Sequence, residues 1–380
     1  MQILIAADKF KDSLTALEVV GAMGKGLLSA FPEARIDAFP MADGGEGSLD
    51  VWLALEGGDV VELEVMDPLF RPVPAGFGIS KDGKTAFVEM ARASGLERLR
   101  PGERDCWNAS TVGTGQLIRH ALDLGVEKII IAAGGSASTD GGTGMAEALG
   151  IHFLDQYGWL VPVSGGCLSA IRTIDARKAH PRLQTVDFEV WTDVNNALCG
   201  PQGSAYTFSR QKGAREDQIP LLDEGLRHFA GICEAQTGKA PVNTPGAAAG
   251  GGLAFGAAVF MNARLLPGAE QFLAYPLLSE AFARADFVIT GEGRLDSQTR
   301  FGKTVQGVCA KAKERHTPVV ALCGAVEAGA QELADMGLLA AFSVLRQPGS
   351  LPEALLRARE DLEAAAWNLG RVLRYYEVTP

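Results

Sequence analysis

The feature that most constrains the fold of this chain is the stretch of residues 129–144. A run of β-branched apolar residues leads into a turn of Gly, Ser and Thr with one Asp, and a helical pattern follows over residues 145–149. This order predicts a strand, a loop and a helix. Such a loop lies at the carboxyl end of its strand, where open α/β sheets bind ligands and where Gly lets backbone N–H groups approach an anion. The stretch favours a phosphate-handling enzyme; the alternative is that its glycines only connect a strand tightly to a helix.

Composition narrows the class of protein. At 380 residues, 47% hydrophobic and 21% charged, the chain is expected to form two globular domains. Its net charge of −11, with no block of Lys and Arg, argues against nucleic acid or an anionic membrane as partner. The six cysteines are scattered without metal-ligand spacing, which favours a cytoplasmic enzyme with reduced thiols. The most apolar segment, residues 247–261, is Gly-rich and shorter than the ~20 residues of a membrane span.

Strands and helices alternate at both ends of the chain. Residues 3–7 read as a buried strand, and Thr15 with Glu18 forms a capping box at the start of a helix. Residues 60–87 have the pattern of antiparallel strands, and from about residue 280 the alternation of strands and helices returns. We therefore expect an α/β protein in which residues 1–72 and 280–380 form one domain and residues 73–279 form an inserted α/β domain.

Four segments share one design, an apolar strand that runs into Gly and an acid. They are residues 43–47, 134–144, 192–195 and 290–296, and a Gly-rich turn at 245–252 accompanies them. Phosphoryl transfer needs backbone donors for phosphate, carboxylates for Mg²⁺, a cation for developing charge and an acid that orients the acceptor hydroxyl. The chain offers each of these groups.

Known nucleotide signatures are absent from the sequence. No segment completes Gly-x-Gly-x-x-Gly, which argues against a nicotinamide-dependent dehydrogenase. The segment that ends in Lys303 is not a P-loop, because Ser297 stands where its first Gly would be. The protein-kinase motifs are also missing. Among single residues, Asp193 is the strongest candidate for a functional carboxylate, with an Asx turn as the alternative. Lys11 and Lys212 are candidates for contact with an anion, with solvated lysines as the alternative.

At these loops the chain resembles the glycerate kinase family of bacteria (type I, D-glycerate kinases). The resemblance spans nearly the whole chain and rests on the motifs at residues 7–14, 40–47, 134–144, 192–195, 211–214 and 290–297. It implies ATP- and Mg²⁺-dependent phosphorylation of D-glycerate, with 2-phosphoglycerate as the favoured product. It also implies a flavodoxin-like or Rossmann-like three-layer domain with a second domain inserted, and an active site in the cleft between them.

The resemblance and the loop chemistry together assign roles to individual residues. Asp193 and Lys11 are the predicted catalytic residues. The predicted contacts to substrate or phosphate are Asp8, Gly44, Gly45, Arg92, Ser136, Asn195, Lys212, Gly250 and Gly251. The predicted metal ligands are Asp43, Glu46, Asp140, Glu292 and Asp296.

The sequence leaves alternatives open. It departs from the family pattern at Ala7, Lys9, Asp12 and Thr139, which bears on the acid that the enzyme accepts. The alternatives are a kinase for another small sugar acid and a non-catalytic relative that binds the acid. The expected partners are glycerate and a nucleotide, with no nucleic acid and no membrane, in a monomer or homodimer.

Overall fold

The structure is a computed structural model, and it describes residues 1–296 and 304–378. Ser297 and Lys303 lie outside the described residues. The chain divides into two compact units: unit 1 is Met1–Asp43 with Ala269–Pro380, and unit 2 is Gly44–Gly268. These limits differ from the predicted boundaries at 72 and 280, because residues 44–72 contribute helix α2 (Ser48–Glu56) and strand β3 (Asp59–Met66), and β3 pairs with the next strand of unit 2.

Unit 1 is built on a parallel sheet of five strands in the order β15-β13-β11-β1-β2. The strands are β1 (Gln2–Ala7), β2 (Arg35–Pro40), β11 (Phe287–Thr290), β13 (Val319–Cys323) and β15 (Ala340–Ser343). Taken along the chain, the order in the sheet is second, first, third, fourth, fifth, which is the flavodoxin-like order. The direction of winding reverses between β1 and β11, so the loops that follow these two strands border a crevice where ligands bind in this fold class.

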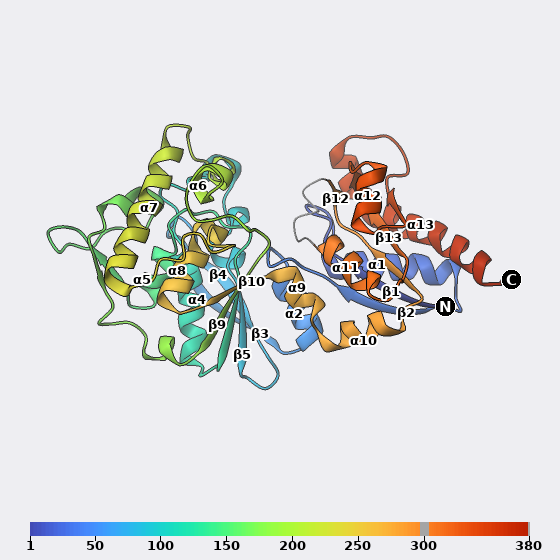
Figure 1. Cartoon of the computed structure of the whole chain (residues 1–380), viewed down its shortest axis with the longest axis horizontal. Coiled ribbons are helices and arrows are strands. Elements are labelled where there is room, and N and C mark those ends of the chain that lie inside the picture. Colours follow the sequence, from blue (N-terminus) through green and yellow to red (C-terminus); the bar gives the residue numbers. More distant parts are fainter. Residues whose placement is uncertain (297–303, 379–380) are drawn as a thin grey trace. The chain divides into compact units, whose positions relative to one another are not determined.

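Helices cover the sheet of unit 1. They are α1 (Ala16–Ala30), α9 (Gly268–Leu273), α10 (Pro276–Arg284), α11 (Thr304–Lys313), α12 (Ala330–Met336) and α13 (Leu351–Val378), with short strands β12 (Arg294–Leu295) and β14 (Ala325–Val326) nearby. The predicted capping box begins α1: the Glu18 N–H donates to Thr15 Oγ1 at 3.3 Å, and the Thr15 N–H donates to the Glu18 carboxylate at 3.0 Å. α1 packs against α13 (Figure 1), and a Cβ at Gly26 would lie 2.2 Å from the Glu363 carbonyl oxygen, so this helix crossing needs glycine.

Unit 2 is built on a mixed sheet of six strands in the order β10-β9-β6-β5-β4-β3. The remaining strands are β4 (Pro72–Ile79), β5 (Thr85–Glu89), β6 (Lys128–Ala132), β9 (Asp187–Thr192) and β10 (Arg264–Pro267). β5, β6, β9 and β10 run parallel, whereas β3 and β4 form an antiparallel pair, as residues 60–87 predicted. The carboxyl ends of the four parallel strands therefore meet at one edge of the sheet.

Helices and one hairpin complete unit 2. The helices are α2, α3 (Ala91–Ser94), α4 (Val112–Asp123), α5 (Thr143–Ala148), α6 (Ser204–Phe208), α7 (Gln218–Thr237) and α8 (Leu253–Phe260), and the hairpin pairs β7 (His152–Leu154) with β8 (Thr173–Asp175). Its core is continuous from the β-sheet to α7 and α8, where the rings of Phe153, Phe229, Phe255 and Phe260 contact one another. The predicted α/β class is confirmed.

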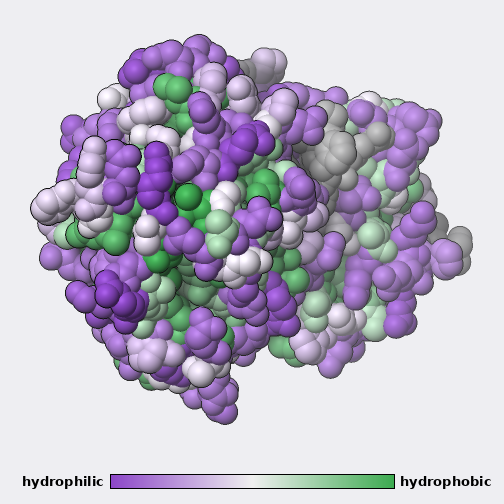
Figure 2. Space-filling model, turned by 60° about the vertical axis from the view of Figure 1, so that its left-hand side comes forward, coloured by the Kyte–Doolittle hydropathy of each residue, from purple (hydrophilic) through white to green (hydrophobic). Residues whose placement is uncertain are grey.

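The surface carries mainly hydrophilic residues on the face that is drawn in Figure 2, and hydrophobic side chains are interspersed among them. Among the residues that the structure describes, none of the helices is both long and apolar enough to cross a membrane.

Candidate active site

In unit 1, Asp8 directly follows β1, next to the end of β11. The Asp8 N–H donates to the Gly291 carbonyl at 2.9 Å, which ties the ends of the two strands together. The Asp8 carboxylate accepts hydrogen bonds from the Lys9 N–H at 2.6 Å and from Thr304 Oγ1 at 2.8 Å. Its side chain is buried, so both oxygens depend on these few partners.

A second carboxylate acts on Asp8. Burial is the larger cause, and the negative charge of Asp43, which follows β2, is the second; together they raise the pKa of Asp8 to about 7. Asp8 is buried and Asp43 is half-buried. Two like charges near each other repel, and a divalent cation relieves such repulsion. Asp8, predicted as a substrate contact, and Asp43, predicted as a metal ligand, are thus near each other, and the pair fits Mg²⁺ chemically.

The other predicted residues of unit 1 lie on the segments after β1 and β11. Lys11 is exposed, and its backbone nitrogen lies 3.1 Å from a Cβ placed on Gly293. Glu292 and Asp296 are half-buried, and Asp296 lies 3.7 Å from Arg294 Nε. Over residues 1–296 and 304–378 we find no group of three or more His, Cys, Asp or Glu arranged to hold a metal ion.

In unit 2, three of the four predicted loops meet at the carboxyl edge of the sheet. The Gly134 N–H donates to the Gly44 carbonyl at 3.1 Å, and a Cβ at Gly135 would lie 2.5 Å from Glu46 Oε1. A Cβ at Gly44 would lie 2.8 Å from the carbonyl carbon of Trp191, just before Asp193. The loops at 44–47, 134–144 and 192–195 are therefore in backbone contact, which only glycine permits at these positions.

The Gly-rich turn at 245–252 packs on the same loops. Gly250, Gly251 and Gly252 have positive φ in succession. The Gly141 N–H donates to the Gly251 carbonyl at 3.0 Å, and a Cβ at Gly251 would lie 2.0 Å from the Ser138 carbonyl oxygen. These glycines serve close packing here; their predicted contact with phosphate stays a prediction.

Lys212 is the buried cation of unit 2. It ends a short turn of 3-10 helix (Arg210–Lys212), and its ammonium donates to Ser136 Oγ at 2.5 Å and to the Ser138 carbonyl at 2.8 Å. Burial lowers its pKa to about 8, against the opposing influence of Cys106 and Asp140. The solvated alternative for this lysine is therefore wrong, since only 4% of the residue is exposed.

Asp140 is fully buried at the centre of the loop at 134–144. Its carboxylate accepts bonds from Thr111 Oγ1 at 2.7 Å, the Thr111 N–H at 2.8 Å and the Gly144 N–H at 3.2 Å, and more weakly from Ser138 Oγ and the Gly142 N–H at 3.3 Å. Burial raises its pKa. Because the chain itself supplies so many donors, this geometry favours an Asp140 that organises the loop over the predicted metal ligand.

Asp193 directly follows β9 and is half-buried. The turn after β9 includes a bond from the Val194 N–H to Thr192 Oγ1 at 3.2 Å, so the hydroxyl of Thr192 takes part in closing it. Asn195 is exposed. Arg92, in the short helix α3 that follows β5, forms an ion pair with Asp50 of α2 at 2.6 Å.

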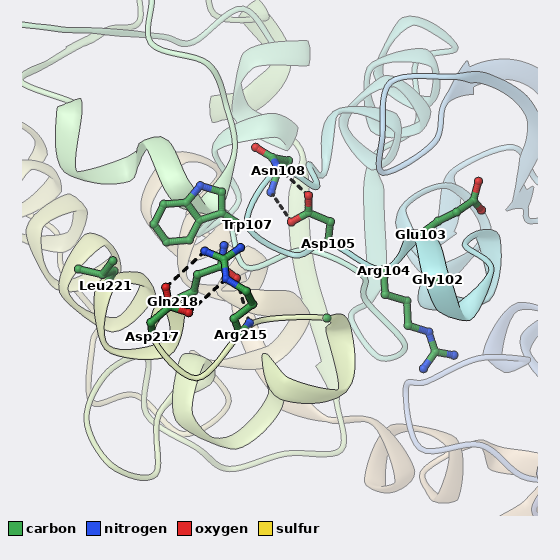
Figure 3. A pocket seen from close by; sticks show the side chains of 11 residues that line it. Gly102, Glu103, Arg104, Asp105, Trp107, Asn108, Arg215, Asp217, Gln218 and Leu221 are labelled. Carbon is green, nitrogen blue, oxygen red and sulfur yellow. Dashed lines mark hydrogen bonds and ion pairs between the residues drawn. The ribbon is translucent and has the colours of Figure 1, made fainter.

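Two cavities of unit 2 lie near these residues. One, of about 500 Å³, is lined by Glu46, Glu89 and Arg92 among others. The other, of about 640 Å³, is lined by residues of segments 102–108 and 213–221, and Figure 3 shows Trp107, Gln218 and Leu221 on the side where Arg215 pairs with Asp217. The second contains none of the predicted site residues. It borders Lys212 through the backbone, because the Cys106 N–H donates to the Lys212 carbonyl at 3.0 Å.

Sequence reasoning missed three residues that support the site: Glu89, Thr111 and Thr304. Glu89 ends β5 and is buried, and burial raises its pKa. An acid at the end of an apolar strand was the available signal for Glu89. Thr111 and Thr304 carry no such signal, because their partners Asp140 and Asp8 are distant in sequence.

Known proteins match this chain over nearly its whole length. A model described as the glycerate kinase family matches residues 3–374. The chain is 43% identical over 377 residues to a glycerate kinase of Halalkalibacterium halodurans, with 99% of each chain covered. It is 40% identical over 373 residues to a glycerate 2-kinase of Escherichia coli, with 98% of each covered. A crystal structure from Salmonella typhimurium LT2, provisionally named glycerate kinase 2, aligns with a TM-score of 0.86 at 40% identity and covers 99% of each chain.

Proposed function

The chain belongs to the glycerate kinase family, and from that premise we propose that it transfers the γ-phosphoryl group of ATP to D-glycerate with the help of Mg²⁺. The proposed product is 2-phosphoglycerate. The name of the Escherichia coli relative, glycerate 2-kinase, supports that position of transfer. The name of the Halalkalibacterium halodurans relative, glycerate kinase, supports glycerate as the acceptor.

The observation that carries the proposal is the Asp8–Asp43 pair at the crevice of unit 1. A buried carboxylate with a pKa of about 7 beside a second carboxylate is costly unless a cation binds there. Asp8 and Asp43 would hold Mg²⁺, which neutralises charge on phosphate oxygens when it is bound. Glu46, Glu292 and Asp296 are the further candidates as ligands.

Lys212 and Ser136 supply the features of an anion site in unit 2. Because the Lys212 ammonium donates to Ser136 Oγ, the Ser136 hydroxyl proton is turned elsewhere and can be donated to an anionic oxygen. The cation beneath strengthens that donor. We therefore assign Ser136 a contact with a phosphate or carboxylate oxygen, and Lys212 the charge that supports it.

Asp193 takes the role of the acid that orients or deprotonates the acceptor hydroxyl. Its place at the carboxyl end of a central parallel strand supports this role. The remaining contacts to glycerate or phosphate are assigned to Lys11, Arg92, Asn195 and the backbone of Gly44, Gly45, Gly250 and Gly251.

The cytoplasm is the proposed compartment. All six cysteines are free thiols and all lie within the described residues. Free thiols are the usual state of cysteines in a reducing compartment.

The proposal is tested by a coupled assay for ADP release with ATP, MgCl₂ and a panel of small hydroxy acids. We expect ADP to form with D-glycerate and a single product whose phosphorus NMR signal matches 2-phosphoglycerate. If ADP is released only with another sugar acid, that acid replaces D-glycerate as the substrate. If ADP is released with none of the acids, the proposed kinase activity is refuted. A 3-phosphoglycerate signal would correct the position.

The same assay tests the role of Asp193. Asp193→Asn should lower kcat about 100- to 10,000-fold, the usual contribution of a general base, with little change in thermal stability. The matched control is Asp187→Asn at the opposite end of β9, where the carboxylate is exposed and pairs with Arg264 at 2.8 Å. Turnover of Asp193→Asn close to that of the control would remove Asp193 from the role.

A further inference from the structure

Glu89 has no place in the function proposed above, although it is a charged residue buried beside the loop at 44–47. It ends β5 and is only 4% exposed. One carboxylate oxygen accepts the Gly47 N–H at 3.1 Å, and the other accepts the Leu49 N–H at 2.9 Å. A buried carboxylate must find partners, and here both partners are backbone N–H groups, one at the end of the loop at 44–47 and one in the first turn of α2.

The two N–H groups belong to the start of α2. The residue before this helix is Gly47, which has a φ of 83° and no side chain that could cap the helix. The first N–H groups of a helix have no partners within it and favour a negative charge. Glu89 supplies from the sheet the cap that an Asp or Ser would normally supply from the chain itself.

The cap holds the acidic loop as well as the helix. Ser48 Oγ donates to the Gly45 carbonyl at 2.6 Å and so closes the turn that contains Glu46. Ser48 lies between Gly47 and Leu49, the two residues whose N–H groups Glu89 binds. On the other side, the loop is tied to Gly134 through the Gly44 carbonyl, and Glu46 lies against Gly135. Glu46 and Glu89 line the same cavity of about 500 Å³.

We infer that Glu89 is a positioning residue for phosphoryl transfer: its carboxylate fixes the loop at 44–47 and thereby sets Glu46 against the loop at 134–144. The inference rests on the proposed function, because Glu46 serves as one of the candidate contacts to the metal–phosphate group. Glu89 itself touches no reacting atom in this account. Its effect on the reaction passes through Glu46.

The test is a double-mutant cycle on kcat with Glu89→Gln and Glu46→Gln. Glu89→Gln keeps the shape but offers one acceptor oxygen for two N–H groups. Support of this kind is typically worth about 10- to 100-fold in activity, so we expect that loss in the wild-type background and little further loss in the Glu46→Gln background. An equal loss in both backgrounds, or wild-type turnover of Glu89→Gln, would overturn the inference.

The matched control is Glu62→Gln. Glu62 lines the same cavity from β3 and is exposed, so its substitution changes the charge there without removing a cap. We expect Glu62→Gln to keep the kcat of wild type. It should also change the melting temperature by the same small amount in the wild-type and the Glu46→Gln backgrounds. A loss equal to that of Glu89→Gln would show that the charge of the cavity matters and not the cap, which contradicts the inference.

A second measurement does not depend on turnover. Amide hydrogen exchange over residues 44–50 should be faster in Glu89→Gln than in the wild type and unchanged in Glu62→Gln. Unchanged protection in Glu89→Gln would overturn the inference even if the enzyme phosphorylates glycerate. Conversely, a wild-type protein without kinase activity would refute the proposed function, while the exchange data would still decide whether Glu89 holds the loop.

Discussion

Among single residues, Asp8 shows most clearly how a buried carboxylate at the proposed site lowers the stability of the folded protein when it ionises. Its pKa of about 7 lies above the ordinary value of 3.8, first because the group is buried and then because Asp43 is near. Below about pH 3.8 the carboxyl is neutral in both the folded and unfolded states. As pH rises from there through about 7, the unfolded state ionises first, and the stability that the neutral group contributed is lost.

Asp8→Asn should therefore stabilise the metal-free protein at high pH. We expect the gain over wild type to be larger at pH 8 than at pH 5. The difference between the two gains has an upper limit of roughly 3 kcal/mol, because wild type loses ~1.4 kcal/mol per pH unit over the two units from pH 5 to the folded-state pKa of about 7. Denaturant unfolding in EDTA at the two pH values measures this difference. Adding Mg²⁺ should then raise the melting temperature of wild type and leave that of Asp8→Asn unchanged. A destabilised Asp8→Asn at pH 8, or equal responses to Mg²⁺, would contradict the electrostatic account.

Among the elements, the glycine turn at 245–252 and the loop at 134–144 depend on each other. The Ser138 carbonyl oxygen that Gly251 approaches also accepts the bond from Lys212 Nζ at 2.8 Å. A side chain at Gly251 would displace this carbonyl, and with it the ammonium. The turn thus controls the position of a charge to which it has no direct bond.

Gly251→Ala should destabilise the protein and lower kcat. Its φ of 68° alone costs roughly 1–2 kcal/mol for a residue with a Cβ, and the clash with Ser138 adds to this. The control is Gly231→Ala in the middle of α7, where a Cβ meets no atom within 4 Å and where Ala should stabilise by up to ~1 kcal/mol. Denaturant unfolding and turnover of both variants measure the effect. Equal stability of the two variants would show that the turn can give way.

The elements also show how far sequence reasoning extends here. The strands with a strong apolar pattern were predicted well: residues 3–7 lie within β1, and the apolar run that begins at residue 129 falls in β6. Helix α2 was missed, because the residue before it is a glycine and its cap comes from Glu89, about forty positions later. The hairpin of β7 and β8 and the short strand β10 were also missed, because three or four residues show no clear period.

For the candidate site, the sequence singled out the loops but did not predict the role of each acid within them. Gly next to an acid singled out three segments that meet in unit 2, but the predicted boundary at 72 placed residues 43–47 in the other domain. The use of each acid was not predictable. Asp140 binds the N–H and hydroxyl of Thr111, which lies on another element, and no local pattern distinguishes such an acid from a metal ligand.

At the scale of the whole molecule, each unit has a core of its own. The core of unit 2 draws its buried residues from positions 65–263, and one core of unit 1 draws on β1, α1, β11, β13 and α13. At 225 residues between Gly44 and Gly268, unit 2 is long enough to fold alone.

We therefore expect residues 44–268, produced alone, to fold. The fragment should melt cooperatively and keep the amide protection of β5, β6 and β9, as measured by circular dichroism and hydrogen exchange. The matched control is the fragment with Phe229→Ala, which removes a ring at the centre of its core and should cost about 3–5 kcal/mol. A fragment that lacks a cooperative transition would show that unit 2 needs the rest of the chain.

The strand order of unit 1 has a consequence for synthesis on the ribosome. β1 lies between β2, which is translated soon after it, and β11, which begins only at Phe287. While the inserted unit emerges and folds, one edge of β1 has no neighbour, and α1 still awaits α13 at the far end of the chain. In the nascent chain, unit 2 can therefore complete its fold before unit 1 does. Asp8 is translated before unit 2, whereas β11 and Thr304, which complete its surroundings, are translated after unit 2.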